Sequence, residues 1–137
     1  MQILFPVFAM IALTTFVVFR LGFARWGAVA RREINIHFFE SYRSYDEPEP
    51  LRILSRHLVN LFETPVIFYL ASIMIYVTGQ TTALLLGLSW LYVLSRYVHT
   101  FVHLTSNIVL WRFRVFGLSV VILTAIWFLL LIQLLLN

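Results

Sequence analysis

The chain has 137 residues, of which 61% are hydrophobic and 12% are charged. Soluble domains carry roughly 25% charged residues, so this composition excludes an ordinary soluble domain and indicates an integral membrane protein. The formal charge of +4 comes from arginines beside apolar runs, which favours a role in membrane topology and no binding of nucleic acid. The chain has no cysteine, which excludes disulfides, cysteine nucleophiles and thiolate metal sites.

Four apolar runs are predicted to span the membrane, at about residues 3–21, 56–77, 82–106 and 115–133. Each is long enough for a hydrocarbon core of about 30 Å. The first run lacks a basic leader and a cleavage site, so we expect it to be retained and not to be a signal peptide. The chain is therefore predicted to be one all-α membrane domain over residues 1–137, a four-helix bundle.

The connections between the spans differ in polarity. Residues 23–54 form the only long hydrophilic stretch; its first half can continue the first helix, and Asp46-Glu-Pro-Glu-Pro50 reads as a loop. Residues 78–81 are a short uncharged turn, and residues 107–114 form a third connection with two arginines. The positive-inside rule places the first and third connections in the cytoplasm and both termini outside it. We expect a multi-pass protein of a bacterial inner membrane, in contact with lipid.

Polar residues form a stripe at the start of the second span. At 100° per residue, Arg56, Asn60 and Glu63 lie within about 60° of one another. Glu63 is the only acidic residue inside an apolar segment. A charged residue at the centre of a membrane helix costs roughly 2.5–3.5 kcal/mol on insertion scales, so such residues face a bundle interior and mark a site.

The third span carries a second stripe at the same predicted depth. Arg96, His99, His103 and Asn107 lie within about 80° of one another. One reading is that these side chains only hydrogen-bond neighbouring helices; the other, which we favour, is a shared polar cavity open to the cytoplasm. The spacing His99-x-x-x-His103 also suits a metal ion, with Glu63 as a third ligand, but the nearby arginines repel cations, so no metal is predicted.

The pattern Arg56-x-x-x-Asn60-x-x-Glu63 followed by Pro65, then Arg96-x-x-His99 and arginines after the third span, resembles the MAPEG family (membrane-associated proteins in eicosanoid and glutathione metabolism). The likeness covers almost the whole chain, and the phrases Phe62-Glu-Thr-Pro-Val-Ile-Phe-Tyr69 and Arg96-Tyr-Val-His-Thr100 are similar to its small bacterial members. The resemblance implies a homotrimer that binds glutathione as co-substrate between neighbouring subunits, near the cytoplasmic side.

The resemblance also implies roles for individual residues. Arg56 and Asn60 would hold glutathione, and Glu63 would pair with its α-amino group. Arg31 or Arg32 would meet a glutathione carboxylate. Arg96 and His99 match the third-span motif, and His103 stands where several members have tyrosine. Arg112 has the spacing of the arginine that stabilises the thiolate, with Arg114 as a second candidate.

These residue types suit the chemistry of glutathione, which carries two carboxylates, one ammonium and a thiol. The planar fork of arginine binds both oxygens of a carboxylate. A cation beside the sulfur lowers the pKa of the thiol and raises the thiolate fraction. The predicted function is a glutathione-dependent transferase or peroxidase that acts on hydrophobic electrophiles or lipid hydroperoxides. The alternative is a non-catalytic lipid-binding or accessory subunit of the same fold.

Overall fold

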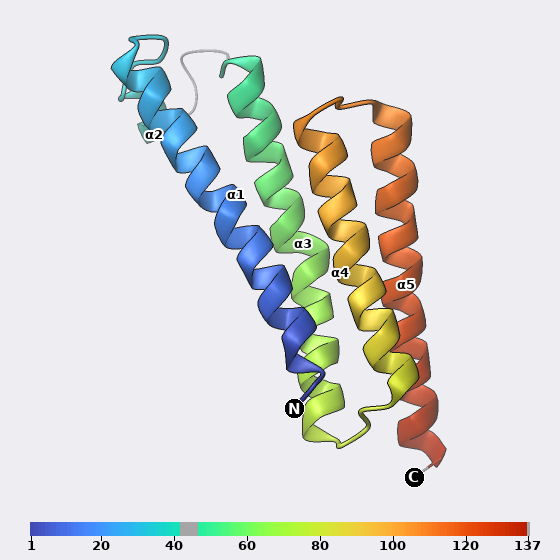
Figure 1. Cartoon of the computed structure of the whole chain (residues 1–137). Helices are drawn as coiled ribbons and strands as arrows, with labels where there is room; N and C mark the ends of the chain where they lie inside the picture. The colour runs from blue at the N-terminus through green and yellow to red at the C-terminus, as the bar shows by residue number, and fades with distance from the viewer. Residues whose placement is uncertain (42–46, 137) are drawn as a thin grey trace.

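The computed structural model describes residues 1–41 and 47–136 and is 84% helical. Four long helices, α1 (Leu4–Ala30), α3 (Glu49–Val77), α4 (Ala83–Leu104) and α5 (Val109–Leu136), run alongside one another (Figure 1). The short helix α2 (Phe38–Ser41) lies at one end of the bundle, and both termini lie at the other. The predicted all-α four-helix membrane bundle is confirmed.

Three helices extend beyond the predicted spans. Helix α1 continues to Ala30, and α3 already begins at Glu49 because Pro48 is its N-cap and Pro50 lies in its first turn, where a missing N–H is tolerated. Helix α5 begins at Val109, so Arg112 and Arg114 are helical and do not belong to a connection. No proline or glycine stands between Val109 and Phe116 to delay the helix. Asp46 of the predicted loop lies outside the described residues.

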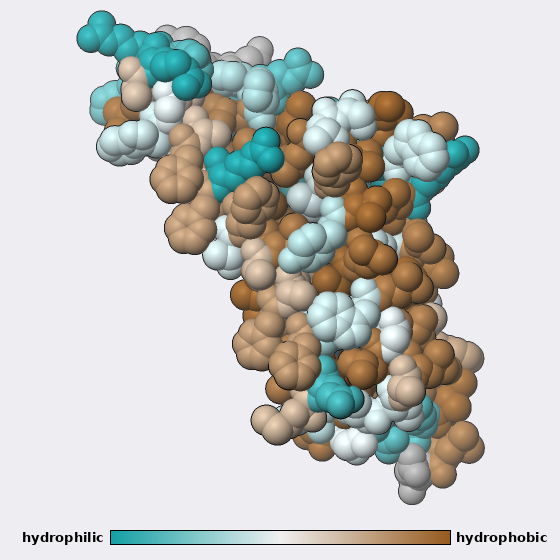
Figure 2. Space-filling model, viewed as in Figure 1, coloured by the Kyte–Doolittle hydropathy of each residue, from teal (hydrophilic) through white to brown (hydrophobic). Residues whose placement is uncertain are grey.

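The helices differ in how apolar they are. Helices α1, α3 and α5 are long and apolar enough to cross a membrane. Helix α4 has 22 residues, about 33 Å at 1.5 Å per residue, but it carries buried serine, arginine, histidine and threonine on one face. Figure 2 shows hydrophobic side chains along most of the bundle and the largest hydrophilic group at the α2 end. Because α4 places its polar side chains inward, its length and its lipid-facing leucines still suit a membrane.

The helices pack as two pairs, α4 with α5 and α1 with α3, with smaller contacts between the pairs. At the end that carries the termini, the core between the pairs is apolar. Phe68 stacks on Tyr92 with ring centroids 4.5 Å apart, and both rings are fully buried. Lipid tails are as apolar as these side chains, so van der Waals packing holds this region together. Ala71, Ser72 and Ser89 are fully buried, and their small size allows close approach of the helices.

The turn between α4 and α5 fixes where α5 begins. Asn107 has a positive φ of 48°, a conformation that asparagine tolerates better than most residues. Its side-chain oxygen accepts a hydrogen bond from Nη1 of Arg112 at 2.8 Å. The turn therefore holds the Arg112 guanidinium near the end of α4.

A second set of contacts ties the residues before α3 to the bundle. Ser55 donates a hydrogen bond to Oε1 of Glu47 at 3.1 Å and accepts one from Nη2 of Arg25 at 3.1 Å. The same Arg25 nitrogen lies 3.7 Å from the Glu47 carboxylate. These contacts fix α1 and α3 to each other at the α2 end.

Candidate functional site

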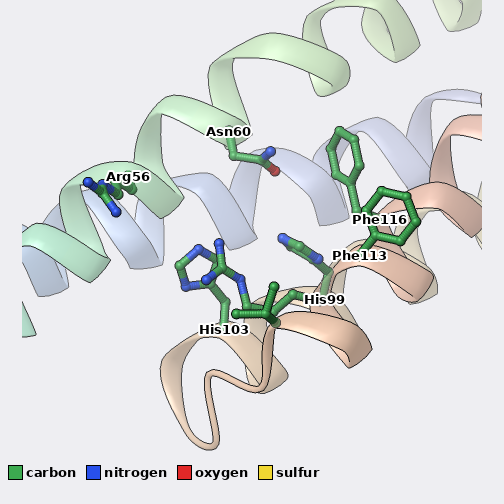
Figure 3. A pocket seen from close by; sticks show the side chains of 8 residues that line it. Arg56, Asn60, His99, His103, Phe113 and Phe116 are labelled. Carbon is green, nitrogen blue, oxygen red and sulfur yellow. The ribbon is translucent and has the colours of Figure 1, made fainter.

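A cavity of about 290 Å³ lies between α3, α4 and α5, toward the α2 end (Figure 3). Its lining combines cationic, amide, imidazole and aromatic side chains from the three helices. These are Arg56 and Asn60 of α3, His99 and His103 of α4, and Val109, Arg112, Phe113 and Phe116 of α5. Residues of three helices thus bring five of the ten predicted site residues to one space.

The inward face of helix α3 includes His57. The buried positions Leu51, Leu54, His57, Leu61 and Pro65 recur every three or four residues, and this is the period of one helix face. On a helical wheel, Asn60 lies about 60° from His57, and Arg56 and Glu63 lie about 100–120° away. Asn60 is therefore half-buried, and Arg56 reaches the cavity from an exposed position.

Arg96 lies behind the cavity and does not line it. Its side chain is 0% exposed, and its Nη2 donates hydrogen bonds to the backbone oxygen and the side-chain oxygen of Asn60. Its guanidinium also lies 5.6 Å from the centroid of the Phe116 ring, a cation–π contact. Nε and Nη1 of Arg96 have no hydrogen-bond partner among the described residues. Arg96 thus positions Asn60, and its Nε and Nη1 remain free to donate hydrogen bonds to another molecule or residue.

Three imidazoles meet beside the cavity. The ring centroids of His57 and His103 are 4.8 Å apart, and His99 lies 5.7 Å from each of them. His57 is 0% exposed, and His99 and His103 are each 3% exposed. His99 and His103 point from α4 toward the space below Asn60 (Figure 3).

The two candidate arginines of α5 point in different directions, because residues two apart on a helix are about 200° apart. Arg112 lines the cavity and is half-buried. Arg114 is exposed, and its guanidinium lies 5.6 Å from the centroid of the Trp111 ring. Within one chain, the geometry therefore favours Arg112 as the cation beside a bound thiol.

Glu63 is not in the cavity of the single chain. Its side chain is exposed on the outer face of α3, among the exposed side chains Val59, Phe62, Val66 and Ile67. The expectation that Glu63 faces the interior of its own bundle is wrong for one chain, because α3 turns its His57 face inward.

Arg31 and Arg32 lie just beyond the end of α1, outside the cavity. Arg31 donates two hydrogen bonds to the Glu33 carboxylate, at 2.7 and 3.2 Å. This contact lowers the pKa of Glu33 and raises the pKa of Arg31, and both side chains are exposed. Arg32 has a positive φ of 58° and is also exposed. In a single chain, neither arginine reaches the residues that line the cavity.

Sequence reasoning missed His57, Thr100 and Phe116. His57 is in the same three- and four-residue register as the buried leucines of α3, and this register was a usable signal. Thr100 hydrogen-bonds His57 at 2.9 Å, and Phe116 contacts both Arg96 and His99. No local pattern indicates that Phe116 lies here, since α5 is apolar on every side.

The structure also bears on the hypothesis that His99, His103 and Glu63 bind a metal ion. Within residues 1–41 and 47–136, no group of three or more histidine or acidic side chains has an arrangement that would hold a metal ion. Glu63, the third ligand in that hypothesis, points away from His99 and His103.

The long apolar helices and the polar cavity together define an integral membrane four-helix bundle with a polar cavity between three of its helices. The model of the MAPEG family matches residues 3–132, and the chain therefore belongs to this family. No curated protein and no solved structure matches the chain. Members of the family generally use glutathione and are often trimers.

Proposed function

We propose that the protein is a glutathione-dependent transferase or peroxidase acting on hydrophobic electrophiles or lipid hydroperoxides. The observation that carries this proposal is the cavity where Arg56, Asn60, His99, His103 and Arg112 converge. Its volume of about 290 Å³ is near the lower end of the usual range for small-molecule sites, roughly 300–1,000 Å³. Its lining offers Arg56 as a cation for one carboxylate and Arg112 as a cation for a thiolate.

The arrangement of charges supports roles for the separate residues. Arg56 lies where a glutathione carboxylate can enter from the exposed side, and Asn60 supplies an amide that Arg96 holds in place. Arg112, fixed by Asn107, would stabilise the sulfur as a thiolate. The thiolate would then attack a substrate that arrives through the lipid.

The outer face of α3 supports a site completed by a neighbouring subunit. Glu63 is a carboxylate on an otherwise apolar exposed face, and leaving it in lipid costs roughly 2.5–3.5 kcal/mol if it stays charged. A second copy of the chain would cover this face, and the α-amino group of glutathione would neutralise the carboxylate. In this homotrimer, Arg31 or Arg32 of one subunit would reach glutathione held by another.

Calorimetric titration with glutathione, followed by conjugation of a generic electrophile, tests the function. We expect binding to the native protein and its loss in Glu63→Gln, with the helical content unchanged. Glu49→Gln is the matched control, because Glu49 is an exposed acid at the start of the same helix and does not line the cavity. Absence of both binding and conjugation in the native protein would refute the proposal.

A non-catalytic, lipid-binding or accessory role is the second candidate. It is favoured by the contact between Arg96 and Asn60, which occupies one predicted glutathione ligand, and by the outward position of Glu63. This candidate predicts a folded protein that binds neither glutathione nor its S-conjugates in the same titration.

The proposed orientation places the α2 end in the cytoplasm and both termini outside it, in a bacterial inner membrane. Six of the ten arginines, at positions 25, 31, 32, 52, 112 and 114, lie at or near this end among the described residues. Because the chain has no cysteine, Thr81→Cys and Asn35→Cys give single labelling sites. An impermeant thiol reagent is expected to label the first in intact cells and the second only after lysis; the reverse pattern would invert the topology.

A further inference from the structure

The buried nitrogens of the three histidines are not accounted for by hydrogen bonds within the chain. Nδ1 and Nε2 of His99, Nδ1 of His103 and Nδ1 of His57 are buried without a partner among the described residues. Buried polar groups in proteins are almost always hydrogen-bonded, so each unpaired nitrogen calls for an explanation. Because His99 and His103 line the cavity, a bound ligand is the partner that the geometry supplies.

The hydrogen bonds around Thr100 fix the tautomer of His57. Thr100 has a single hydroxyl hydrogen, which it donates to the backbone oxygen of Arg96 at 2.9 Å. Its oxygen then accepts from Nε2–H of His57, at 2.9 Å. Nδ1 of His57 is therefore unprotonated, and this ring lies 4.8 Å from that of His103, centroid to centroid. His57 thus lies behind His99 and His103, and its Nδ1 has a lone pair that accepts no hydrogen bond within the described structure.

Among the residues that line the cavity, only the imidazoles can take up a proton at neutral pH. Arginine stays protonated in proteins, the asparagine amide is not a base, and the other lining side chains are apolar. Arg112 can stabilise a thiolate but cannot accept the proton that a thiol loses. Glu63 and the acids of the α2 end lie outside the cavity.

We propose that His99 and His103 form the general base that takes the thiol proton, with His57 as the positioning residue behind them. This inference rests on the proposed glutathione-dependent function. The charged groups that face the cluster are Arg96 from α4 and Arg112 from α5, and the third imidazole comes from α3. The negative charge of the new thiolate offsets the positive charge that the imidazole pair gains.

The step balances without a further reactant. The S–H bond of glutathione breaks, its proton passes to an imidazole nitrogen of the pair, and its electron pair stays on sulfur. With an α,β-unsaturated carbonyl, the thiolate forms the S–C bond and the π electrons move to the enolate. The imidazolium then returns its proton to the enolate, and the histidine pair is neutral again.

Proton counting on the native protein tests this proposal without any substitution. Glutathione is titrated calorimetrically at neutral pH in buffers of different ionisation enthalpy, and thiolate formation is followed by its ultraviolet absorbance. We expect the thiolate signal to appear with almost no proton released to the buffer, because the histidine pair retains it. A thiolate signal with about one proton released per glutathione would overturn the proposal, and so would binding without any thiolate signal.

Variants assign the proton to the pair. In His99→Gln/His103→Gln, the amides fill similar space but accept no proton, so we expect about one proton released per thiolate formed. We also expect kcat/KM for conjugation to fall about 10²- to 10⁴-fold, the usual contribution of a general base. His37→Gln, in the stretch between α1 and α2, is the matched control and is expected to behave as the native protein. Unchanged proton counts in the double variant would overturn the assignment.

His57→Gln separates positioning from proton transfer. Its amide can still donate to Thr100, so we expect a lower kcat with KM and the proton count close to native; an unchanged kcat would remove His57 from the proposal.

The titration of the native protein distinguishes failure of the proposed function from failure of this inference. No heat with glutathione refutes the proposed function and this inference together, whereas binding and thiolate formation with full proton release refute only the histidine base.

Discussion

The end of the bundle that carries the termini and the end that carries α2 are built from different side chains. At the first, Phe68, Tyr92, Ile75 and Ile126 are buried in a continuous apolar core. Toward the second, His57, Arg96, His99 and His103 are equally buried but keep nitrogens without a hydrogen-bond partner in the described structure. The buried nitrogens without a partner gather mainly toward the second end, while at the first end the Tyr92 hydroxyl and Nε1 of Trp127 are also unpaired among the described residues.

Helix α4 contains both kinds of packing. Its first half contributes Leu85, Ser89 and Tyr92 to the apolar core, and its second half contributes Arg96, His99 and His103 to the polar region. Buried unpaired polar groups cost free energy, roughly 1–3 kcal/mol each and more when charged. Most of these groups lie toward the α2 end, around the cavity, and the following predictions test this difference between the ends.

Among the variants that compare the two ends, the largest effect is expected from the cation nearest the proposed thiolate. Arg112→Gln removes the charge from the cavity, and loss of such electrostatic stabilisation costs about 10²- to 10³-fold in rate. We expect kcat/KM for conjugation to fall by that amount, measured with a generic electrophile. Arg114→Gln, two residues on but stacked on Trp111, is expected to stay within about threefold of native. Equal losses in both variants would contradict the assignment of Arg112.

The contact between Arg96 and Asn60 is expected to matter for stability. Asn60→Ala leaves the buried guanidinium without the amide that accepts from it, and hydrogen bonds to charged groups contribute roughly 1.5–3 kcal/mol. We expect a loss of that size in thermal or denaturant unfolding in detergent. Asn60→Ala/Arg96→Met is expected to recover part of the loss, because the uncompensated charge is removed as well. A double variant less stable than Asn60→Ala would show that Arg96 has another partner.

At the apolar end, Phe68→Ala is expected to reduce stability and leave the ligand site intact. In soluble proteins such a change costs about 3–5 kcal/mol, but the transfer part falls away when the unfolded chain remains in lipid. We therefore expect a loss of about 2 kcal/mol with glutathione affinity unchanged. Weaker glutathione binding, in a calorimetric titration of the folded variant, would mean that the two ends are coupled.

The same contrast explains what the sequence could predict. Apolar runs and arginine-rich connections identify a helical membrane bundle, because lipid allows few other structures. The polar stripes also identified Arg56, Asn60, His99 and His103, and the family resemblance identified Arg112. The structure brings these five residues to one cavity.

The rotation of each helix was harder to predict than its existence. In α3, Glu63 appeared to be the inward residue because it is charged, yet His57 occupies the buried register and Glu63 faces outward. In α5, apolar residues surround the helix, so nothing local distinguishes the faces of Arg112 and Arg114. The face of each helix that turns inward depends on packing between helices, and this packing cannot be predicted from the local pattern of a single sequence.

The smallest expected effect concerns the ion pair of Arg31 and Glu33 at the α2 end. Arg31 holds the pKa of Glu33 below its usual value, so the pair is intact above the unfolded-state pKa and is lost as pH falls through the lowered folded-state pKa. Both side chains are exposed, so Glu33→Gln is expected to change the unfolding midpoint only slightly at neutral pH and not at all in acid. If Arg31 instead serves glutathione in a neighbouring subunit, freeing it from Glu33 is expected to tighten binding by less than about threefold, measured by titration. Weaker binding in Glu33→Gln would place the carboxylate, not Arg31, in contact with the ligand.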